Sequence, residues 1–252
     1  MTRAQLKQLE QDLWSAADNL HANSDLKATE YSTPVLGLIF LKFADINYRR
    51  YEDAIDAEFA QLEGTLPKEE YYRLVRTEET KHLPFDLLRQ FDNIPDNATG
   101  DVFGQIYEYF LGNFALAEGQ GGGEFFTPRS VVRLMVEIIE PHGGTVFDPA
   151  CGSGGMFVRP ADFIARHRRE LEAQGKDTSV FVYGQEKQRE TVKLARMNLA
   201  VNGLRGEVAP AITYYSDEFK SFGAFDYVLA NPPFNVDDVS LSAVEKHRRF
   251  NT

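Results

Sequence analysis

The strongest constraint on the fold is a short apolar run, residues 145–148, that is followed at once by a glycine-rich segment, residues 149–155. An apolar helical pattern begins directly afterwards, at Met156. A buried strand, a glycine loop and a helix in this order are typical of an open α/β sheet, in which a loop without Cβ atoms lets the backbone approach a ligand closely. The loop residues expected to line a binding site are Gly152, Ser153, Gly154 and Gly155.

The residues around this loop limit the classes of ligand that it could bind. No Gly-Lys-Ser/Thr follows the loop, so it does not match the loops that cradle phosphates. The third glycine of the dinucleotide-binding pattern is absent, and an acid, Asp148, precedes the loop. Asp148 therefore favours a ligand that carries positive charge, such as an amino group or a sulfonium. The alternative, a turn that only reverses the chain, explains the clustered glycines less well.

A second strand is expected at residues 180–186, and it also ends in an acid, Glu186. The helix predicted next, residues 191–204, has an apolar face that consists of Val192, Ala195, Leu199 and Ala200. Ligands of open α/β sheets bind beyond the carboxyl ends of the strands, where an acid after the second strand commonly accepts ribose hydroxyls. Glu186 could instead cap the helix that begins near Lys187. The two roles are compatible, and we favour the ribose.

A further apolar run, residues 226–230, ends at the segment Asn231, Pro232, Pro233 and Phe234. Two prolines cannot continue a central strand because proline lacks the N–H donor. The chain therefore leaves the sheet in a stiff loop that offers a carboxamide, a carbonyl and an aromatic ring. This set suits the binding of a flat ring that carries an amino group. The alternative is a strand that ends in a proline turn with a buried phenylalanine.

Taken together, these motifs closely resemble those of the N6-adenine DNA methyltransferases, and specifically of the modification subunit of Type I restriction–modification systems. Residues 148–155 (DPACGSGG) are similar to the family's cofactor loop and residues 231–234 (NPPF) to its catalytic loop. Residues 124–135 look like an additional cofactor segment, and residues 13–45 are similar to the family's N-terminal helical domain. The combination makes the resemblance specific, whereas NPPF alone also suits protein and RNA methylases.

The resemblance implies a fold and a cofactor. The expected fold is α/β, a Rossmann-like S-adenosylmethionine-dependent methyltransferase sheet, apparently incomplete, preceded by an all-α N-terminal domain. Glycines in the stretch 117–123 mark the boundary, giving a helical domain at residues 1–116 and a methyltransferase domain at residues 117–252. Residues expected to bind S-adenosyl-L-methionine, besides the glycine loop, are Glu124, Phe125, Phe126, Thr127, Pro128, Arg129, Asp148, Glu186 and Asp217.

Three of these assignments leave alternatives open. Thr127 is the candidate for the amino-acid carboxylate of the cofactor, or it caps the helix that ends near Pro141. Phe125 and Phe126 pack on the cofactor or hold the domains together. Asp217 follows a strand expected at residues 212–215 and suits the cofactor's adenine, but a solvated turn is the alternative that we favour.

The resemblance also implies the reaction, which is methyl transfer to the N6 amino group of adenine in DNA. Asn231 and the Pro232 carbonyl would accept the two amino hydrogens, Pro233 would stiffen the loop, and Phe234 would stack on a flipped base. Protein or RNA methylation, or a truncated module that binds cofactor or partners without turnover, are the alternatives.

Composition and charge bear on the partners. The chain has 27 basic and 38 acidic side chains and a net charge of −11, which is unfavourable for a protein that binds DNA by itself. The resemblance implies that a specificity subunit reads the DNA within a complex that also has a restriction subunit. A single cysteine, Cys151, suits a reducing cytoplasm, and the 5 histidines show no metal-ligand spacing. The apolar stretch at residues 35–41 is too short to span a membrane.

The N-terminal part of the chain is predicted to be helical, with Leu6, Leu9, Leu13, Ala17 and Leu20 on one face. Thr33 and Pro34 form a typical helix start. Another helix is expected at residues 101–114, and its apolar positions are Val102, Ile106, Tyr109 and Phe110.

The sheet predicted here has fewer strands than the family's sheet, at residues 145–148, 180–185, 207–213 and 226–230. We therefore expect an N-terminal part of a longer subunit, truncated after the NPPF motif. Its last strand would expose an edge and favour self-association.

Overall fold

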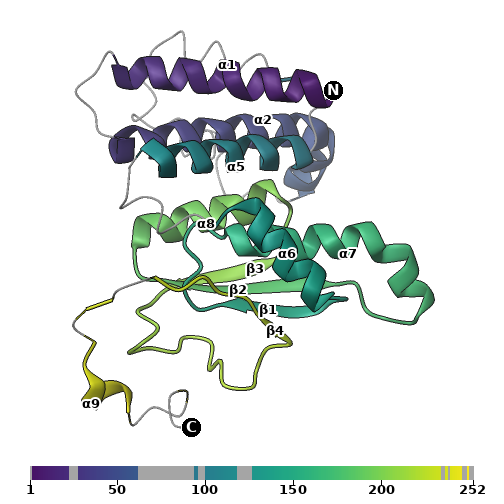
Figure 1. Cartoon of the computed structure of the whole chain (residues 1–252). Coiled ribbons are helices and arrows are strands. Elements are labelled where there is room, and N and C mark those ends of the chain that lie inside the picture. The colour runs from purple at the N-terminus through teal and green to yellow at the C-terminus, as the bar shows by residue number, and fades with distance from the viewer. Residues whose placement is uncertain are drawn as a thin grey trace. The chain divides into compact units, whose positions relative to one another are not determined.

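The computed structural model describes residues 2–22, 28–61, 94–95, 100–117, 127–233, 236–237, 239–245 and 249. The chain divides into two compact units, Met1–Ile106 and Tyr107–Thr252 (Figure 1). Helix α5, Gly100–Ala117, begins in the first unit and continues into the second. The domain boundary expected at residues 116 and 117 lies at the end of this helix and stays a prediction.

The first unit is helical in its described part. It contains α1 (Arg3–Ala22) and α2 (Ala28–Gln61), and Leu6, Leu13 and Ala17 of α1 are buried as predicted. The predicted helix start at Pro34 is wrong, because α2 begins at Ala28 and Pro34 lies inside it. A proline inside a helix removes one hydrogen bond. Burial of neighbouring apolar side chains, among them Val35, Leu36 and Ile39, offsets this loss.

The predicted helix at residues 101–114 is confirmed as α5, but its buried face differs from the prediction. Phe103, Ile106, Tyr107 and Phe110 are fully buried, whereas Val102 and Tyr109 are only partly buried. Within the second unit, the Tyr107 hydroxyl donates a hydrogen bond of 3.0 Å to the carbonyl of Leu194. Pairing of this hydroxyl allows a tyrosine to occupy a fully buried position.

The second unit contains a parallel four-stranded sheet of order β3-β2-β1-β4, which confirms the α/β class. The strands are β1 (Gly144–Asp148), β2 (Val180–Glu186), β3 (Gly206–Pro210) and β4 (Tyr227–Val228). The chain moves from β1 through β2 to β3 on one side and then returns to place β4 on the other side of β1. Such a reversal of direction is the place where open α/β sheets bind ligands.

Two expectations for this sheet are wrong in detail. The third strand ends at Pro210, and the residues expected to be a strand, 212–215, form a turn in which the N–H of Tyr215 donates to the carbonyl of Ile212 at 2.8 Å. Pro210 has no N–H, so it is well suited to the end of a strand. The fourth strand has only two residues instead of the run expected at 226–230.

Three helices cover one face of the sheet, namely α6 (Arg129–Ile139), α7 (Gly155–Ala173) and α8 (Arg189–Val201) (Figure 1). Their apolar side chains form a core with the strands, and its most buried members are Val132, Val136, Val146, Phe157, Val182 and Ala195. In α8, Val192, Ala195 and Leu199 are buried as predicted, whereas Ala200 is exposed.

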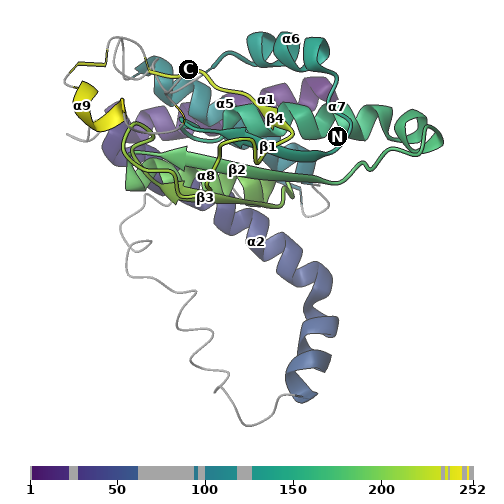
Figure 2. The same ribbon diagram turned by 90° about the horizontal axis from the view of Figure 1, so that it is seen from below.

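The connection between β3 and β4 covers the opposite face, which Figure 2 views from below. Phe147 of β1 stacks on Phe225 of this connection, with ring centroids 4.6 Å apart. Tyr183 of β2 meets Phe219 edge-on at 5.2 Å. A short helix, α9 (Leu241–Val244), follows later in the chain. None of the described helices combines the length and the apolar character that crossing a membrane requires.

Candidate cofactor and substrate site

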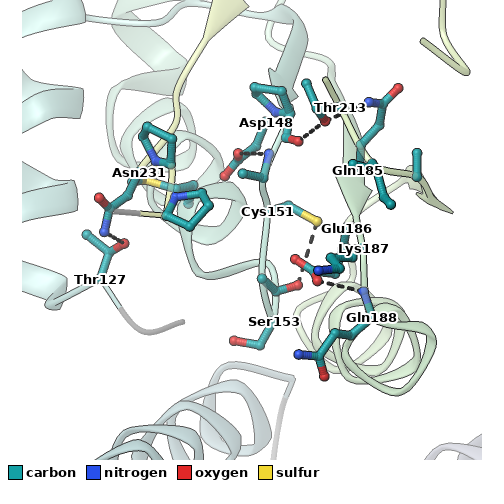
Figure 3. A pocket seen from close by; sticks show the side chains of 18 of the residues that line it. Thr127, Asp148, Cys151, Ser153, Gln185, Glu186, Lys187, Gln188, Thr213 and Asn231 are labelled. Atoms are coloured by element: carbon teal, nitrogen blue, oxygen red, sulfur yellow. Dashed lines mark hydrogen bonds between the residues drawn. The ribbon is translucent and has the colours of Figure 1, made fainter. Parts of the chain in front are cut away.

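A cavity of about 330 Å³ lies beyond the carboxyl ends of the strands (Figure 3). Segments that are distant in the sequence form its walls: Asp148–Ser153 with Gly155 and Met156 after β1, Gln185–Gln188 after β2, Ala211–Tyr214 after β3, Asn231–Pro233 after β4, and the single residues Thr127 and Val236. This is the size range of pockets that hold small molecules and cofactors.

The cavity brings together most of the predicted site residues. Those that line it are Thr127, Asp148, Gly152, Ser153, Gly155, Glu186, Asn231, Pro232 and Pro233. Those that the structure describes but does not place in its wall are Pro128, Arg129, Gly154 and Asp217. Those that fall outside the described residues are Glu124, Phe125, Phe126 and Phe234.

The glycine loop has a backbone that needs glycine. Gly152 has φ 52° and Gly154 has φ 81°, a left-handed conformation that side chains make costly. Gly154 is the N-cap residue of α7, although it does not line the cavity. On β2, Gly184 lets the loop approach, because a Cβ there would lie 2.8 Å from Cys151 Sγ. The Cys151 N–H then donates to the Gln185 carbonyl at 2.9 Å.

Asn198 of α8 holds this loop from behind. It is fully buried, and its Nδ2 donates to the carbonyl of Ser153 at 3.0 Å. Its Oδ1 accepts a hydrogen bond of 2.8 Å from Asn202 Nδ2. The sequence interpretation missed Asn198, although a polar residue on the apolar face of a helix signals a buried hydrogen-bonding role.

Gln185, which the sequence interpretation also missed, ties three walls of the cavity together. It is fully buried at the end of β2. Its Nε2 donates to Thr213 Oγ1 at 2.9 Å, and its Oε1 accepts from the Glu218 N–H at 2.9 Å. The Thr213 hydroxyl donates in turn to the carbonyl of Pro149. These bonds fix the segment after β3 against the loop after β1.

Two buried acidic side chains, Asp148 and Glu186, lie in the cavity wall, which also contains the exposed Lys187. Asp148 is 1% exposed, and its Oδ1 accepts from the Ala150 N–H at 2.9 Å. Burial raises the pKa of Asp148 to about 7, and the negative charge of Glu186 adds to this rise, while the bond from Ala150 opposes it. A cationic ligand in the cavity would therefore be favoured. Burial also raises the pKa of the Cys151 thiol, so this cysteine is no nucleophile.

Glu186 combines a helix contact with a place in the cavity wall. Its Oε1 accepts a hydrogen bond of 2.8 Å from the N–H of Gln188, the residue that precedes α8. The acid therefore does contact the start of the following helix, one of the two roles considered for it. Its side chain also lines the cavity, where the second role, binding of a ribose, remains a prediction.

Thr127 is not a helix cap, because α6 has Pro128 at its N-cap position and no side-chain cap hydrogen bond. The Thr127 hydroxyl instead accepts a hydrogen bond of 3.1 Å from Asn231 Nδ2 (Figure 3). The two residues are 104 positions apart in the sequence. A contact between the segment before the sheet and the loop after β4 therefore closes one side of the cavity.

Two predicted cofactor residues form other contacts. Asp217 accepts a hydrogen bond of 2.9 Å from the Ser221 N–H and pairs with Arg249 at 3.5 Å, so it stabilises a turn outside the cavity wall. Arg129 pairs with Glu108 at 2.7 Å. Burial raises the pKa of Glu108, which Arg129 and Arg159 both oppose. Among the described residues, no group of histidine, cysteine and acidic side chains could hold a metal ion.

Comparison with known proteins identifies the families that the chain resembles. A family model described as N-6 DNA Methylase matches residues 98–252, and one described as HsdM N-terminal domain matches residues 9–118. The Type I restriction enzyme MjaIX methylase subunit of Methanocaldococcus jannaschii is 42% identical over 153 residues, which are 59% of this chain and 26% of that protein. The Type I restriction enzyme HindI methylase subunit of Haemophilus influenzae is 44% identical over 139 residues, which are 54% of this chain and 29% of that protein.

Solved structures give the same fold. The type I restriction-modification system methyltransferase subunit from Streptococcus thermophilus superimposes with a TM-score of 0.70 at 22% identity, over 97% of this chain and 67% of that chain. The chain thus spans less than a third of the two curated relatives and two thirds of this structure. The resemblance seen in the sequence motifs is confirmed: the chain belongs to the N-6 DNA methylase family and carries the N-terminal domain typical of type I modification subunits.

Proposed function

We propose that the chain transfers a methyl group from S-adenosyl-L-methionine to the N6 amino group of adenine in DNA, as the modification subunit of a Type I restriction–modification complex. The observation that carries this proposal is the shared cavity. Gly152, Ser153 and Gly155 of the glycine loop line the same space as the Asn231–Pro233 loop, so a methyl carrier held by the first would lie within reach of a base held by the second.

The cavity wall suits the proposed cofactor. When bound, S-adenosyl-L-methionine supplies a methyl group made electrophilic by a sulfonium. Asp148 and Glu186 give the cavity a negative potential that favours the positive charge of such a molecule. Glu186 would accept ribose hydroxyls, the glycine loop would let the backbone approach, and Thr127 would donate to the amino-acid carboxylate. Phe125 and Phe126 are proposed to pack nearby.

The loop after β4 would supply the groups that act on the base. An adenine amino group is a poor nucleophile because its lone pair is delocalised into the ring. Acceptance of its two hydrogens by Asn231 Oδ1 and the Pro232 carbonyl favours a pyramidal nitrogen and returns the lone pair for attack. This is electrostatic preorganisation combined with alignment. The target atom is inaccessible inside a duplex, so we propose that the base is flipped out and stacks on Phe234.

The partners follow from charge and family. With a net charge of −11, the chain is a poor binder of DNA phosphates by itself. We propose that a specificity subunit supplies most DNA contacts and that a restriction subunit joins the same complex. The curated relatives are named as methylase subunits of Type I restriction enzymes, which supports a complex of several subunits. We also propose that the protein is cytoplasmic, in keeping with its single cysteine. We retain residues 1–116 as the N-terminal helical domain and residues 117–252 as the methyltransferase domain.

The test is transfer of tritiated methyl from S-adenosyl-L-methionine to DNA, with and without the specificity subunit, alongside calorimetry with the cofactor. Asn231→Ala should keep cofactor affinity and lower methylation on the order of 100-fold, because an acceptor preorganised for the transition state is lost. Asn19→Ala, at an exposed position of α1, is the matched amide control. Undiminished turnover by Asn231→Ala would refute its role, and binding without transfer by the wild type would favour a non-catalytic module.

A further inference from the structure

We propose that Thr127 is a positioning residue that sets which way round the Asn231 carboxamide sits, and that a carboxylate-bearing ligand in the cavity selects the productive orientation. The inference rests on the proposed function, because it assigns a state to the group that would accept the adenine hydrogens. It adds a coupling between the cofactor end of the cavity and the base end.

The geometry behind the inference is a single contact between two elements. Asn231 Nδ2 donates to Thr127 Oγ1 at 3.1 Å, and both residues line the cavity (Figure 3). Both side chains are partly buried. In the described part of the chain, neither side chain makes a second hydrogen bond. The Thr127 hydroxyl hydrogen and Asn231 Oδ1 therefore remain available to ligands.

The Thr127 hydroxyl has one hydrogen, which it can donate to only one acceptor, and this choice determines the orientation of the Asn231 carboxamide. If Thr127 donates its hydrogen to Asn231 Oδ1, the carboxamide is turned so that its NH2 group faces the base. An NH2 group cannot accept a hydrogen from the adenine amino group. If Thr127 donates its hydrogen elsewhere, its oxygen can only accept, and Nδ2 must face it. Oδ1 is then left for the base.

A carboxylate next to Thr127 would take the hydroxyl hydrogen, because hydrogen bonds to a charged acceptor are stronger than those to a neutral amide. The start of α6 supports an anion at this place. The helix begins two residues after Thr127, has no side-chain cap and has no acidic residue in its first turn. Among the described residues, no acidic side chain of the first turn offsets the N-terminal dipole of α6. A cofactor carboxylate held here would order the carboxamide before the base arrives.

Two substitutions of Thr127 separate the effect of its hydroxyl on the Asn231 carboxamide from the effect of the size of its side chain. Thr127→Val keeps the shape and removes the hydroxyl, whereas Thr127→Ser keeps the hydroxyl. At saturating cofactor, Thr127→Val should lower kcat for methyl transfer about 10-fold, as expected for the loss of one hydrogen bond that acts in the transition state. Thr127→Ser should recover most of this loss. Ser130→Ala, which removes an exposed hydroxyl outside the cavity wall, should behave as the wild type.

A spectroscopic measurement reports on the carboxamide without requiring turnover. The side-chain NH2 signal of Asn231, assigned by its loss in Asn231→Asp, should shift when S-adenosylhomocysteine saturates the wild type or Thr127→Ser. It should not shift in Thr127→Val. Saturation with 5′-methylthioadenosine, which lacks the carboxylate, should leave the signal near its position in the free protein.

The outcomes distinguish the two proposals. A wild-type chain that binds no cofactor by calorimetry overturns the proposed function and this inference with it. A wild type that binds cofactor, together with a Thr127→Val variant whose Asn231 signal and kcat match those of the wild type, overturns the inference alone. Loss of kcat on Thr127→Val that is equally large in an Asn231→Asp background would also overturn it, because that background has no NH2 group to orient.

Discussion

At the scale of single residues, the site depends on groups whose ordinary behaviour the fold alters. Asp148 is an acid buried without a cationic partner among the described residues, next to a second acid, Glu186. Burial of an unpaired carboxylate lowers stability, and such groups with shifted pKa values are concentrated at functional sites, where a ligand can supply the missing partner. The same reasoning applies to Gly152 and Gly154, whose positive φ values hold the loop open for a close backbone approach.

The raised pKa of Asp148 predicts how stability depends on pH. Between its ordinary value of 3.8 and the folded value of about 7, the folded protein keeps a proton that the unfolded chain has lost. This group therefore makes the protein less stable as pH rises through that window, and its full cost is present above pH 7. Asp148→Asn should remove this cost. In urea unfolding, the free energy of unfolding of the variant should therefore rise relative to that of the wild type from pH 5 to pH 8.

The control for this prediction is the stabilisation of both proteins by the added cofactor. S-adenosyl-L-methionine should stabilise the wild type more than Asp148→Asn at pH 8, because the wild type offers the Asp148 carboxylate to it in addition to Glu186. An equal free-energy difference between the two proteins at both pH values would show that Asp148 does not titrate as proposed.

At the scale of elements, the loop after β1 is held by helices and strands that do not belong to it. Asn198 of α8 binds the Ser153 carbonyl, and Gln185 of β2 connects to the segment after β3. These contacts are made by fully buried side chains, so they fix the loop before a ligand binds. A preformed loop lowers the entropy that binding must offset.

Asn198→Leu should therefore weaken both stability and cofactor binding. Leucine is of similar size but removes the donor to the Ser153 carbonyl, at a cost of roughly 1–3 kcal/mol in unfolding free energy. The Asn202 amide loses its bond to Asn198 Oδ1 but keeps its bond to the backbone carbonyl of residue 198. Chemical denaturation and calorimetry measure the two effects. Lys193→Ala, which removes only an exposed pair with Glu190 on the same helix, is the matched control and should change neither. Unchanged cofactor affinity in a folded Asn198→Leu would contradict the role of Asn198 in holding the loop.

At the scale of the whole molecule, the described sheet ends at β4, whose Val228 is 59% exposed. An open strand edge with an apolar side chain is a surface on which another strand can pair. The two methylase subunits from Methanocaldococcus jannaschii and Haemophilus influenzae are longer than this chain, which covers 26% and 29% of them. Self-association through this edge is the expectation that the topology gives for the chain by itself.

Val228→Lys should therefore reduce self-association, since a charged side chain on an edge strand opposes pairing. Light scattering across a concentration series measures it. Ile138→Lys, which places the same charge at an exposed apolar position of α6, serves as the control and should leave the association unchanged. A wild-type chain that remains monomeric at high concentration would contradict this prediction.

The sequence alone was enough for the features that depend on neighbouring residues. Glycines fix the loop after β1 and hydrophobic periodicity places the helices, because each of these is a property of a few consecutive residues. The prolines after Asn231 did not give the end of the fourth strand, because β4 already ends at Val228. The same locality explains the errors. Nothing in the residues near Pro34 reveals that packing of α2 would tolerate it, and the tyrosines at 214 and 215 have strand propensity although Pro210 ends the strand.

Only the tertiary structure decided which side chains meet. The pairing of Thr127 with Asn231 joins positions 104 residues apart, that of Asn198 with Ser153 joins positions 45 apart, and neither residue type announces its partner. Whether a hydroxyl caps its own helix or turns to a distant amide depends on where another loop lies in space. The residues therefore specified the chemistry that the site could perform, and the packing of the sheet specified which of those groups share one cavity.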